Sequence, residues 1–564
     1  MNFIIFLASY ILIIISVVGY GQIIEYLFFN NKKEKINIGY LGLQGLFFLT
    51  IYSYFSSFFI AHDIIHNSIL ILLGVIFFLI NFKFLFIENR KEFYIFFLVF
   101  LILFIGSLAF KTNEDFPFYH FNYTMIIVER PSVLGMGVFN HGFRTPSSIF
   151  YINSFFYLPF IKYYSFHMAA VMFMGFGNLI LIKKIIFFIT KNCSSFIAYL
   201  SLLSFVFINV VFYRIAEHGT DRSAQILIFI LIIEILIIIN FFELEKYQKR
   251  IKNILILTGI VISLKAFYLL YLILIIYLTF FLLQKVTLNK IIRDNFFIIS
   301  SFLFIIFLIF LINLQNSGCF LYPVTFTCLV NLPWSINSSE ISFMSDYYEF
   351  WAKGGAGPGF KVEMEQALYI KNFNWVKNWL VVYFAEKGIN TTLGTIFISL
   401  IVYLTFFSKS KKQTENIRSY KIIFAIIFLL FIEWFVKHPA FRYGGFCLLA
   451  LLIYLPVSIL LEKFDQKDLK KKFISLIIIT IFIFVGRNVS RLTQEIKKYN
   501  YKPLTNTFYY IGINTGENYL LPNNQISTII ESFEKCRRVN NNDKCKKIKE
   551  KIGLFYNKYF FKKI

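Results

Sequence analysis

Charged side chains gather in one polar stretch of this chain, residues 112–148, between two long apolar segments. Glu114 and Asp115 directly follow the first apolar segment, and Tyr119 and His120 come four and five residues after Asp115. A carboxylate beside apolar and aromatic surface has a raised pKa and can act as a base near neutral pH. A carboxylate can equally bind a divalent cation. The stretch is therefore the first candidate site, with Asp115 at its centre.

Three other polar turns carry charges that would complete such a site, at residues 214–222, 263–266 and 437–442. Charged side chains at membrane depth are costly unless they face a cavity and one another. Arginine binds phosphate through paired hydrogen bonds and lysine binds it as a point charge. The pattern predicts a shared pocket for an anionic phosphate group, with the cationic candidates Arg144, Arg222, Lys265 and Arg442. The other candidate acid, metal-binding or sugar-binding residues are Tyr119, His120, His141, Glu217, His218 and Asp221.

The elements that position these residues are predicted membrane-spanning helices. Hydrophobic residues make up 58% of the chain and charged residues 15%, which is too apolar for a soluble domain. A run of roughly 17 to 25 apolar residues predicts one span. The sequence therefore predicts an all-α, polytopic transmembrane bundle of about fourteen spans over residues 1–486. The spans are expected near residues 3–29, 38–60, 68–87, 93–110, 167–182, 195–213, 223–241, 254–264, 267–283, 295–314, 391–408, 422–437, 443–461 and 473–486.

The charge pattern predicts the orientation of the bundle. Basic residues cluster in alternate loops, and the positive-inside rule places those loops in the cytoplasm. Topology therefore accounts for the net charge of +25, and nucleic acid is not an expected partner. Two long segments, residues 111–166 and 315–390, then lie on the extracytoplasmic side. All seven histidines of the chain, inside and outside these segments, fall on the same side. The tail, residues 487–564, follows on that side, although Arg487 and Arg491 after the last span would favour the cytoplasm.

Four of the six cysteines fall in these outer segments as two close pairs. In an oxidising compartment such pairs predict the disulfides Cys319–Cys328 and Cys536–Cys545.

Several outer motifs resemble the GT-C superfamily of integral membrane glycosyltransferases, and in particular a bacterial multi-pass group within it. They lie between residues 90 and 450, although four predicted spans precede Asp115 and many members place their loop aspartate after the first span. The motifs are Asp115-x-x-x-Tyr119-His120, Asn140-His141-x-x-Arg144, the Ser147–Tyr151 run, the Ser317–Cys328 loop, Leu332-Pro333-Trp334 and His438-Pro-x-x-Arg442.

The resemblance implies a GT-C-like fold in the bacterial inner (plasma) membrane, with the site facing the outside. The enzyme would transfer a sugar, with inversion, from a polyprenyl-phosphate-linked donor to a cell-envelope glycan, lipid or protein. Asp115 matches the superfamily's loop aspartate, a base or metal ligand, and Asp221 matches a second acidic position. The cofactor, where one is used, would be Mg²⁺ or Mn²⁺ at Asp115 and Asp221.

Two alternatives stay open on the sequence. An O-antigen polymerase or ligase would use arginine-rich outer loops rather than one essential aspartate. A lipid or polysaccharide flippase or transporter would carry charges deep within its spans. Glu234 and Glu433 are the clear carboxylates inside the predicted spans.

Overall fold

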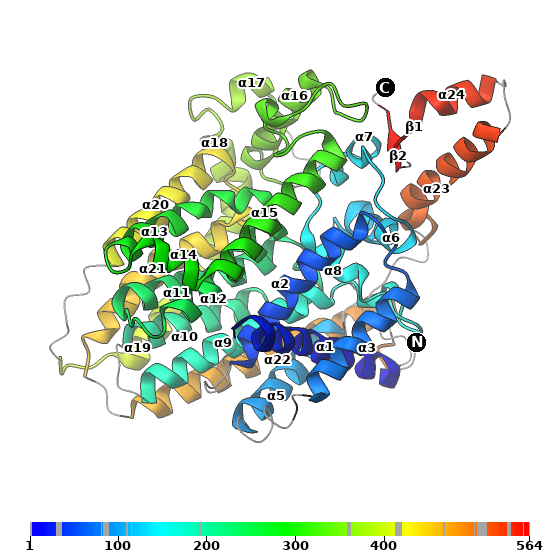
Figure 1. Cartoon of the computed structure of the whole chain (residues 1–564). Helices are drawn as coiled ribbons and strands as arrows, with labels where there is room; N and C mark the ends of the chain where they lie inside the picture. Colours follow the sequence, from blue (N-terminus) through cyan, green and yellow to red (C-terminus); the bar gives the residue numbers. More distant parts are fainter. Residues whose placement is uncertain are drawn as a thin grey trace.

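The structure of the chain is a computed structural model, and it is almost entirely helical (Figure 1). It describes residues 3–29, 37–80, 82, 90–108, 111–113, 115–190, 195–357, 362–411, 420–465, 468–500, 502–504, 516–538, 543–556 and 558–562. The sheet found among these residues is one two-stranded hairpin near the C-terminus.

A helix overlaps each predicted span, although residues 81 and 83–87 of the predicted span 68–87 lie outside the described residues. These helices are α1 (Phe3–Phe29), α2 (Ile38–Ser57), α3 (Ile64–Ile80), α5 (Arg90–Ser107), α9 (Met168–Thr190), α10 (Ser195–Val211), α11 (Asp221–Asn240), α12 (Tyr247–Leu264), α13 (Leu272–Leu283), α15 (Phe296–Ser317), α19 (Ile389–Phe406), α20 (Tyr420–Lys437), α21 (Gly445–Glu462) and α22 (Leu469–Tyr499). Among the described residues, nine helical segments are long and apolar enough to cross a membrane. They indicate a membrane protein, whereas α3, α5, α10, α12 and α20 are shorter or more charged, so the count of fourteen stays a prediction.

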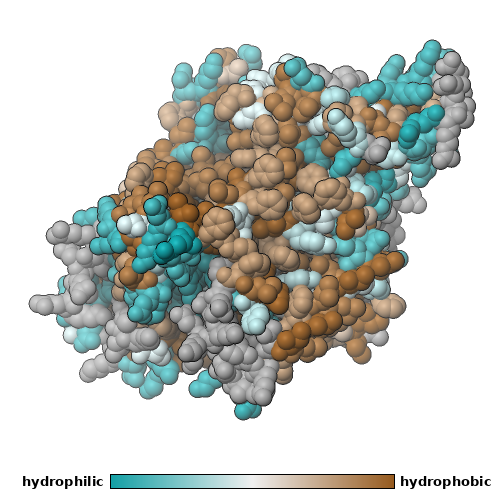
Figure 2. Space-filling view, in the orientation of Figure 1, coloured by the Kyte–Doolittle hydropathy of each residue, from teal (hydrophilic) through white to brown (hydrophobic). Residues whose placement is uncertain are grey.

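Helix α11 forms the centre of the bundle and contacts α9, α10, α12 and α21. Every residue from Ser223 to Ile239 is buried, as expected for a helix that is apolar on all sides. Many apolar side chains of the surrounding helices are exposed, and Figure 2 shows them as a broad hydrophobic face across the bundle. This central helix begins at Asp221, so its first turn carries a candidate site residue.

The predicted break in the apolar run at residues 254–283 is confirmed. Helix α12 ends at Leu264, Lys265 takes an extended conformation, and a 3₁₀ helix, η5 (Ala266–Tyr271), leads into α13. The break leaves Lys265 between two helices rather than inside one.

Short helices and loops cover one end of the bundle, here termed the loop end. The first group is η1 (Phe116–His120), α6 (Phe121–Glu129), α7 (Met136–Phe139), η2 (His141–Phe143), α8 (Ser148–Ser154) and η3 (Tyr163–Ser165). The second is η6 (Thr325–Thr327), α16 (Ser338–Lys353), α17 (Gln366–Tyr369), α18 (Val376–Trp379) and η7 (Leu380–Gly388). Three short helices, η4 (Ile215–Glu217), α14 (Leu288–Asp294) and η8 (Phe441–Tyr443), lie between long helices in the chain.

The C-terminal tail also packs on the loop end. It consists of α23 (Gly516–Arg538), α24 (Asp543–Lys551), β1 (Ile552–Phe555) and β2 (Lys558–Phe561). Leu134 exchanges backbone hydrogen bonds with Tyr559 and Phe561 at 2.9 and 3.0 Å, and Trp334 packs against Phe560. The tail therefore contacts both long loop segments, residues 111–166 and 315–390.

Two arginines of α22, Arg487 and Arg491, donate to carbonyl groups at the ends of neighbouring helices. Arg487 donates to the Val210 carbonyl at the end of α10 at 2.5 Å, and Arg491 to the Gly106 carbonyl at the end of α5 at 3.2 Å. Helix C-termini attract cations, which gives both arginines a favourable position beside the ends of α10 and α5.

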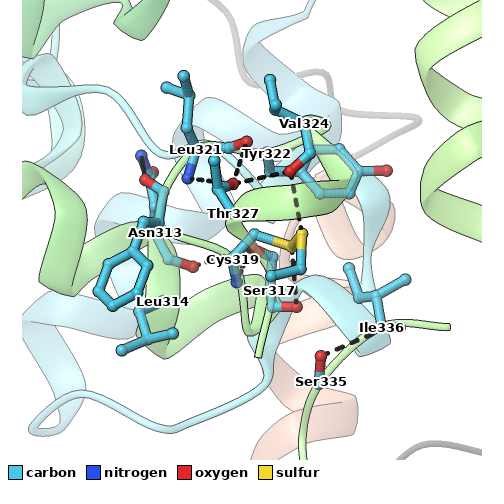
Figure 3. Close-up of a disulfide and its surroundings, with 12 residues drawn as sticks. Asn313, Leu314, Ser317, Cys319, Leu321, Tyr322, Val324, Thr327, Ser335 and Ile336 are labelled. Carbon is cyan, nitrogen blue, oxygen red and sulfur yellow. Dashed lines mark hydrogen bonds between the residues drawn. A yellow bond between two sulfur atoms is a disulfide. The ribbon is translucent and has the colours of Figure 1, made fainter. Parts of the chain in front are cut away.

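Both predicted cysteine pairs are disulfide-bonded in the structure. The Cys319–Cys328 loop is further held by Thr327, whose hydroxyl bonds the Leu321 backbone and the Val324 carbonyl (Figure 3).

Candidate functional site

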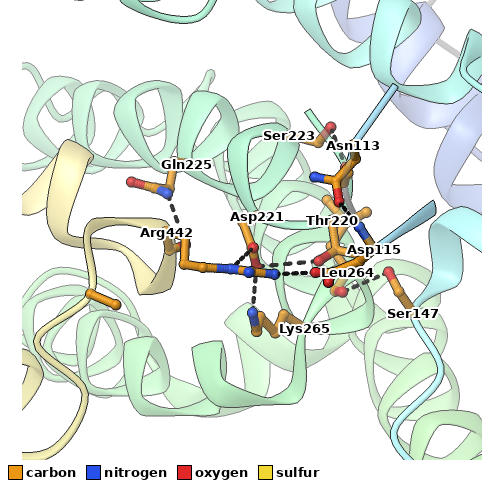
Figure 4. A network of polar contacts seen from close by, with 12 residues as sticks. Asn113, Asp115, Ser147, Thr220, Asp221, Ser223, Gln225, Leu264, Lys265 and Arg442 are labelled. Atoms are coloured by element: carbon orange, nitrogen blue, oxygen red, sulfur yellow. Dashed lines mark hydrogen bonds and ion pairs between the residues drawn. The ribbon is translucent and has the colours of Figure 1, made fainter. Parts of the chain in front are cut away.

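Four predicted site residues from four separate parts of the chain meet at the loop end (Figure 4). Arg442 donates from Nη2 to Asp115 Oδ2 at 2.7 Å and from Nε to Asp221 Oδ2 at 2.9 Å. Lys265 donates to the other oxygen of Asp221. Two carboxylates and two cations thus form one continuous ionic network.

Local structure places the two carboxylates. Asn113 Oδ1 accepts the Asp115 backbone N–H at 2.8 Å, while its amide donates to the Glu217 carbonyl at 3.2 Å. The π-helical turn η1 brings the Tyr119 hydroxyl to 3.3 Å from Asp115 Oδ2. Asp221 is the first residue of α11, where the N–H groups and dipole favour an anion.

Hydrogen bonds from α11 and from Ser147 hold the backbone that carries the two cations. Gln225, one turn after Asp221 on α11, donates to the Arg442 carbonyl at 3.1 Å and accepts from the Cys447 N–H at 3.1 Å. The Ser147 hydroxyl donates to the Leu264 carbonyl at 2.6 Å, which fixes the turn that carries Lys265. The Lys265 ammonium also lies 4.1 Å from the centre of the Tyr443 ring.

The two carboxylates differ in exposure. The Asp221 side chain is 8% exposed and bonded to both cations, whereas that of Asp115 is 30% exposed and bonded to Arg442 alone among the described cations. Burial raises the pKa of Asp115, but the charge and hydrogen bond of Arg442 outweigh burial and hold that pKa below its usual value. Burial lowers the pKa of Arg442, and Asp221, Tyr443 and Asp115 more than compensate. The expectation of a raised pKa from apolar and aromatic neighbours is therefore wrong for Asp115, which is ionised at neutral pH.

His120 lies beside this network and is buried. Its Nε2 has no hydrogen-bond partner within the described part of the chain, and its ring lines a cavity of about 30 Å³ with Asn113, Thr124 and Asn153. That volume is sufficient for one or two water molecules. Burial lowers the pKa of His120 to about 4, so the imidazole is neutral at pH 7.

Arg144 belongs to a second cluster and does not contact Asp115. It donates to the Gly137 carbonyl at 3.0 Å, to the Tyr322 hydroxyl at 2.8 Å and to Glu340 on α16. His141 is exposed one turn earlier. Arg144 thus ties the first outer segment to the second, and Glu114 lies outside the described residues.

The cluster at residues 214–222 divides between two environments. Glu217 pairs with Arg214 at 3.1 Å, and Glu217 is also the strongest electrostatic partner of Arg222. His218 is buried, and its Nε2 lies 2.6 Å from the Phe212 carbonyl. Burial lowers the pKa of His218 to about 3. Asp221 alone of this cluster enters the network with Arg442.

The donor set does not fit a divalent cation as arranged. Both Asp221 oxygens accept from cationic side chains, and Arg442 lies between Asp221 and Asp115. A metal ion there would meet two positive charges. Over the described ranges, no three His, Cys, Asp or Glu side chains are grouped so as to hold a metal ion.

Three residues of the site were not predicted. Gln225 could have been found, because it follows Asp221 by one helical turn, and Tyr443 is adjacent to Arg442. Trp351 on α16 carries no such signal. Its ring centre lies 5.7 Å from the Arg442 guanidinium carbon and 6.3 Å from the Tyr443 ring.

A family model matches residues 1–449, which include all four members of the ionic network. The chain belongs to this family, described as a domain of unknown function (DUF8201). The matched DUF8201 region ends within α21, before α22 and the tail. Comparison with curated proteins and with solved structures found no match.

Proposed function

We propose that this DUF8201 protein is a membrane glycosyltransferase that uses a polyprenyl-phosphate-linked sugar. The observation that carries the proposal is the convergence of Asp115, Asp221, Lys265 and Arg442 at the ends of apolar helices. The reaction needs a base for the acceptor hydroxyl and cations for the departing phosphate. Both kinds of group meet here.

Asp115 is the base in this proposal. Its Oδ2 accepts from Arg442 and Tyr119, whereas Oδ1 accepts no side-chain hydrogen bond from the residues described. The acceptor hydroxyl gives its proton to Oδ1 as its oxygen attacks the anomeric carbon of the sugar. The bond from that carbon to the phosphate oxygen breaks, and the prenyl phosphate leaves with the electron pair. Attack opposite the leaving group inverts the anomeric configuration.

Arg442 and Lys265 stabilise the negative charge on the leaving phosphate. Helix α13 offers an apolar surface for the prenyl chain. Helix α13 follows Lys265 through η5 and exposes Ile273, Ile276 and Phe280. A lipid chain against this helix would leave its phosphate at the level of Lys265, which supports a lipid-linked donor over a soluble nucleotide sugar.

The finer topology belongs to the proposal as well. The loop end faces the extracytoplasmic side of the bacterial inner membrane, the bundle has about fourteen spans and a GT-C-like architecture, and the acceptor is a cell-envelope glycan, lipid or protein. Two disulfides near this end support an oxidising environment.

Transfer of radiolabelled sugar from prenyl-phosphate donors to membrane acceptors tests the function. Asp115→Asn should lower the transfer rate by about 100-fold or more, the usual contribution of a general base. Asp346→Asn changes an exposed carboxylate on α16 and should leave the rate unchanged. Equal rates for wild type and Asp115→Asn would remove Asp115 from the chemistry. Absence of transfer by the wild-type protein across the donor panel would favour the polymerase, ligase or transporter alternatives.

A further inference from the structure

The ionic network is asymmetric around Arg442. Asp221 has two cationic partners, so it keeps Lys265 when Arg442 is engaged elsewhere. Asp115 has Arg442 as its one cationic hydrogen-bond partner among the described residues. The bond between Asp115 and Arg442 is therefore the one that can open at the lower cost.

We propose that Asp115 occupies the anion-binding position of Arg442 in the resting protein, and that a phosphate group bound there displaces Asp115. The proposal rests on the function proposed above for the identity of the anion. Asp115 then competes with the phosphate of the substrate for Arg442. It also predicts an order of events, because the carboxylate is released to accept a hydrogen bond from the acceptor only after the phosphate has bound.

The geometry of the guanidinium permits this exchange. Arg442 contacts Asp221 through Nε and Asp115 through Nη2, so the two bonds use different nitrogens. The Arg442 main chain is held by Gln225 and by the Tyr383 hydroxyl, which accepts from the adjacent Phe441 N–H at 2.7 Å. A phosphate oxygen can therefore replace Asp115 at Nη2 while the side chain keeps its position on Asp221.

Partial solvent exposure of Asp115 and Arg442 lowers the free-energy cost of separating them. The side chains of Asp115 and Arg442 are 30% and 32% exposed, and partly exposed ion pairs contribute little net free energy. The released Asp115 retains the Tyr119 hydroxyl at 3.3 Å as a hydrogen-bond donor. The Asp221 side chain is 8% exposed, and loss of a cationic partner from such a buried carboxylate is costly. Asp115 is therefore the carboxylate that the phosphate displaces from Arg442.

Trp351 provides a built-in reporter of this exchange. The chain has five tryptophans, of which Trp334, Trp375, Trp379 and Trp434 are buried and Trp351 is half-buried. The Trp351 ring centre lies 5.7 Å from the Arg442 guanidinium carbon. A phosphate that binds Arg442 changes the charge beside this ring and hence its fluorescence, and Trp351→Phe is the control for the origin of the signal.

The experiment titrates the full-length protein in detergent with farnesyl phosphate and, separately, with pyrophosphate, and follows tryptophan fluorescence. Asp115→Asn removes the competing charge and should lower the dissociation constant about tenfold relative to wild type, as expected for one charged hydrogen bond. Asn113→Ala removes the hydrogen bond to the Asp115 N–H and should lower the dissociation constant about threefold. The dissociation constant of Asp346→Asn should equal that of wild type. Asn113→Ala keeps the test valid should Asp115→Asn fail to fold.

The outcomes separate the exchange from the function on which it rests. If wild type, Asp115→Asn and Asn113→Ala bind farnesyl phosphate with equal affinity, the exchange is overturned and the phosphate site stands. Absence of binding by every variant would overturn both. Tighter binding by Asp115→Asn confined to pyrophosphate would support the exchange and overturn the lipid-linked source of the anion.

Discussion

Substitution of Arg442 by Gln tests the centre of the network directly. The change removes the one guanidinium that bonds both Asp115 and Asp221. Among the described residues, it leaves Asp221 with Lys265 as its one cationic partner and Asp115 with no cationic partner. The glutamine amide nitrogen corresponds to the Nε position of arginine, so the change removes the charge and the Nη2 hydrogen bond to Asp115.

The magnitude follows from burial. Removal of one partner from a buried ion pair costs about 3 to 5 kcal/mol, and a partly exposed pair contributes about 1 kcal/mol or less. Because Lys265 still neutralises Asp221, we expect the lower end, a loss of about 3 kcal/mol in the free energy of unfolding. Asp221→Asn leaves Lys265 without its carboxylate and should cost a similar amount.

A double-mutant cycle makes the prediction specific. Combined, Arg442→Gln and Asp221→Asn should cost about 4 kcal/mol rather than the sum of about 6, because both single changes break the same Arg442–Asp221 ion pair and the sum counts that loss twice. Reversible unfolding in mixed SDS micelles, followed by circular dichroism, measures these values. Arg442→Gln combined with Asp346→Asn is the additive control. Additivity within about 0.5 kcal/mol for the first pair would refute the inferred coupling.

Three further predictions concern other parts of the loop end. The pKa of His120 falls to about 4 on folding, so the unfolded chain binds more protons between pH 6.5 and 4 and stability declines as pH falls through that window. His120→Gln should remove about 2 kcal/mol of the decline between pH 7 and 5, measured by unfolding at each pH, and an unchanged slope would contradict the assignment. Arg144→Met should destabilise the outer segments by about 3 kcal/mol and speed amide exchange in α16, whereas unchanged exchange would show that the Glu340 contact does not hold that helix. The double change Cys319→Ser and Cys328→Ser removes a disulfide between cysteines nine residues apart and should lower the free energy of unfolding by about 2 to 3 kcal/mol. The melting temperature should then be lower than that of a Cys447→Ser control.

The sequence by itself determined what depends on short-range pattern. Long apolar runs predicted the helices, and the polar interruption at Lys265 predicted the break between α12 and α13. The polar stretch after the fourth apolar run identified Asp115 with Tyr119 and His120 as candidate site residues, and in the structure Asp115 precedes η1, which contains the other two. Each of these features is decided by neighbours along the chain.

Only the tertiary structure decided which of the distant charges meet. Arg442 reaches Asp115 across 327 residues, whereas Arg144, only 29 residues from Asp115, joins Glu340 instead. Helix α11 is apolar on nearly every side, so its hydrophobic pattern does not specify which neighbour packs on which face. The packing of α12 and η8 against α11 therefore selects Lys265 and Arg442 as the partners of Asp221, and Trp351 of α16 lies against Arg442. Such contacts depend on long-range packing of apolar helices, which local periodicity does not encode.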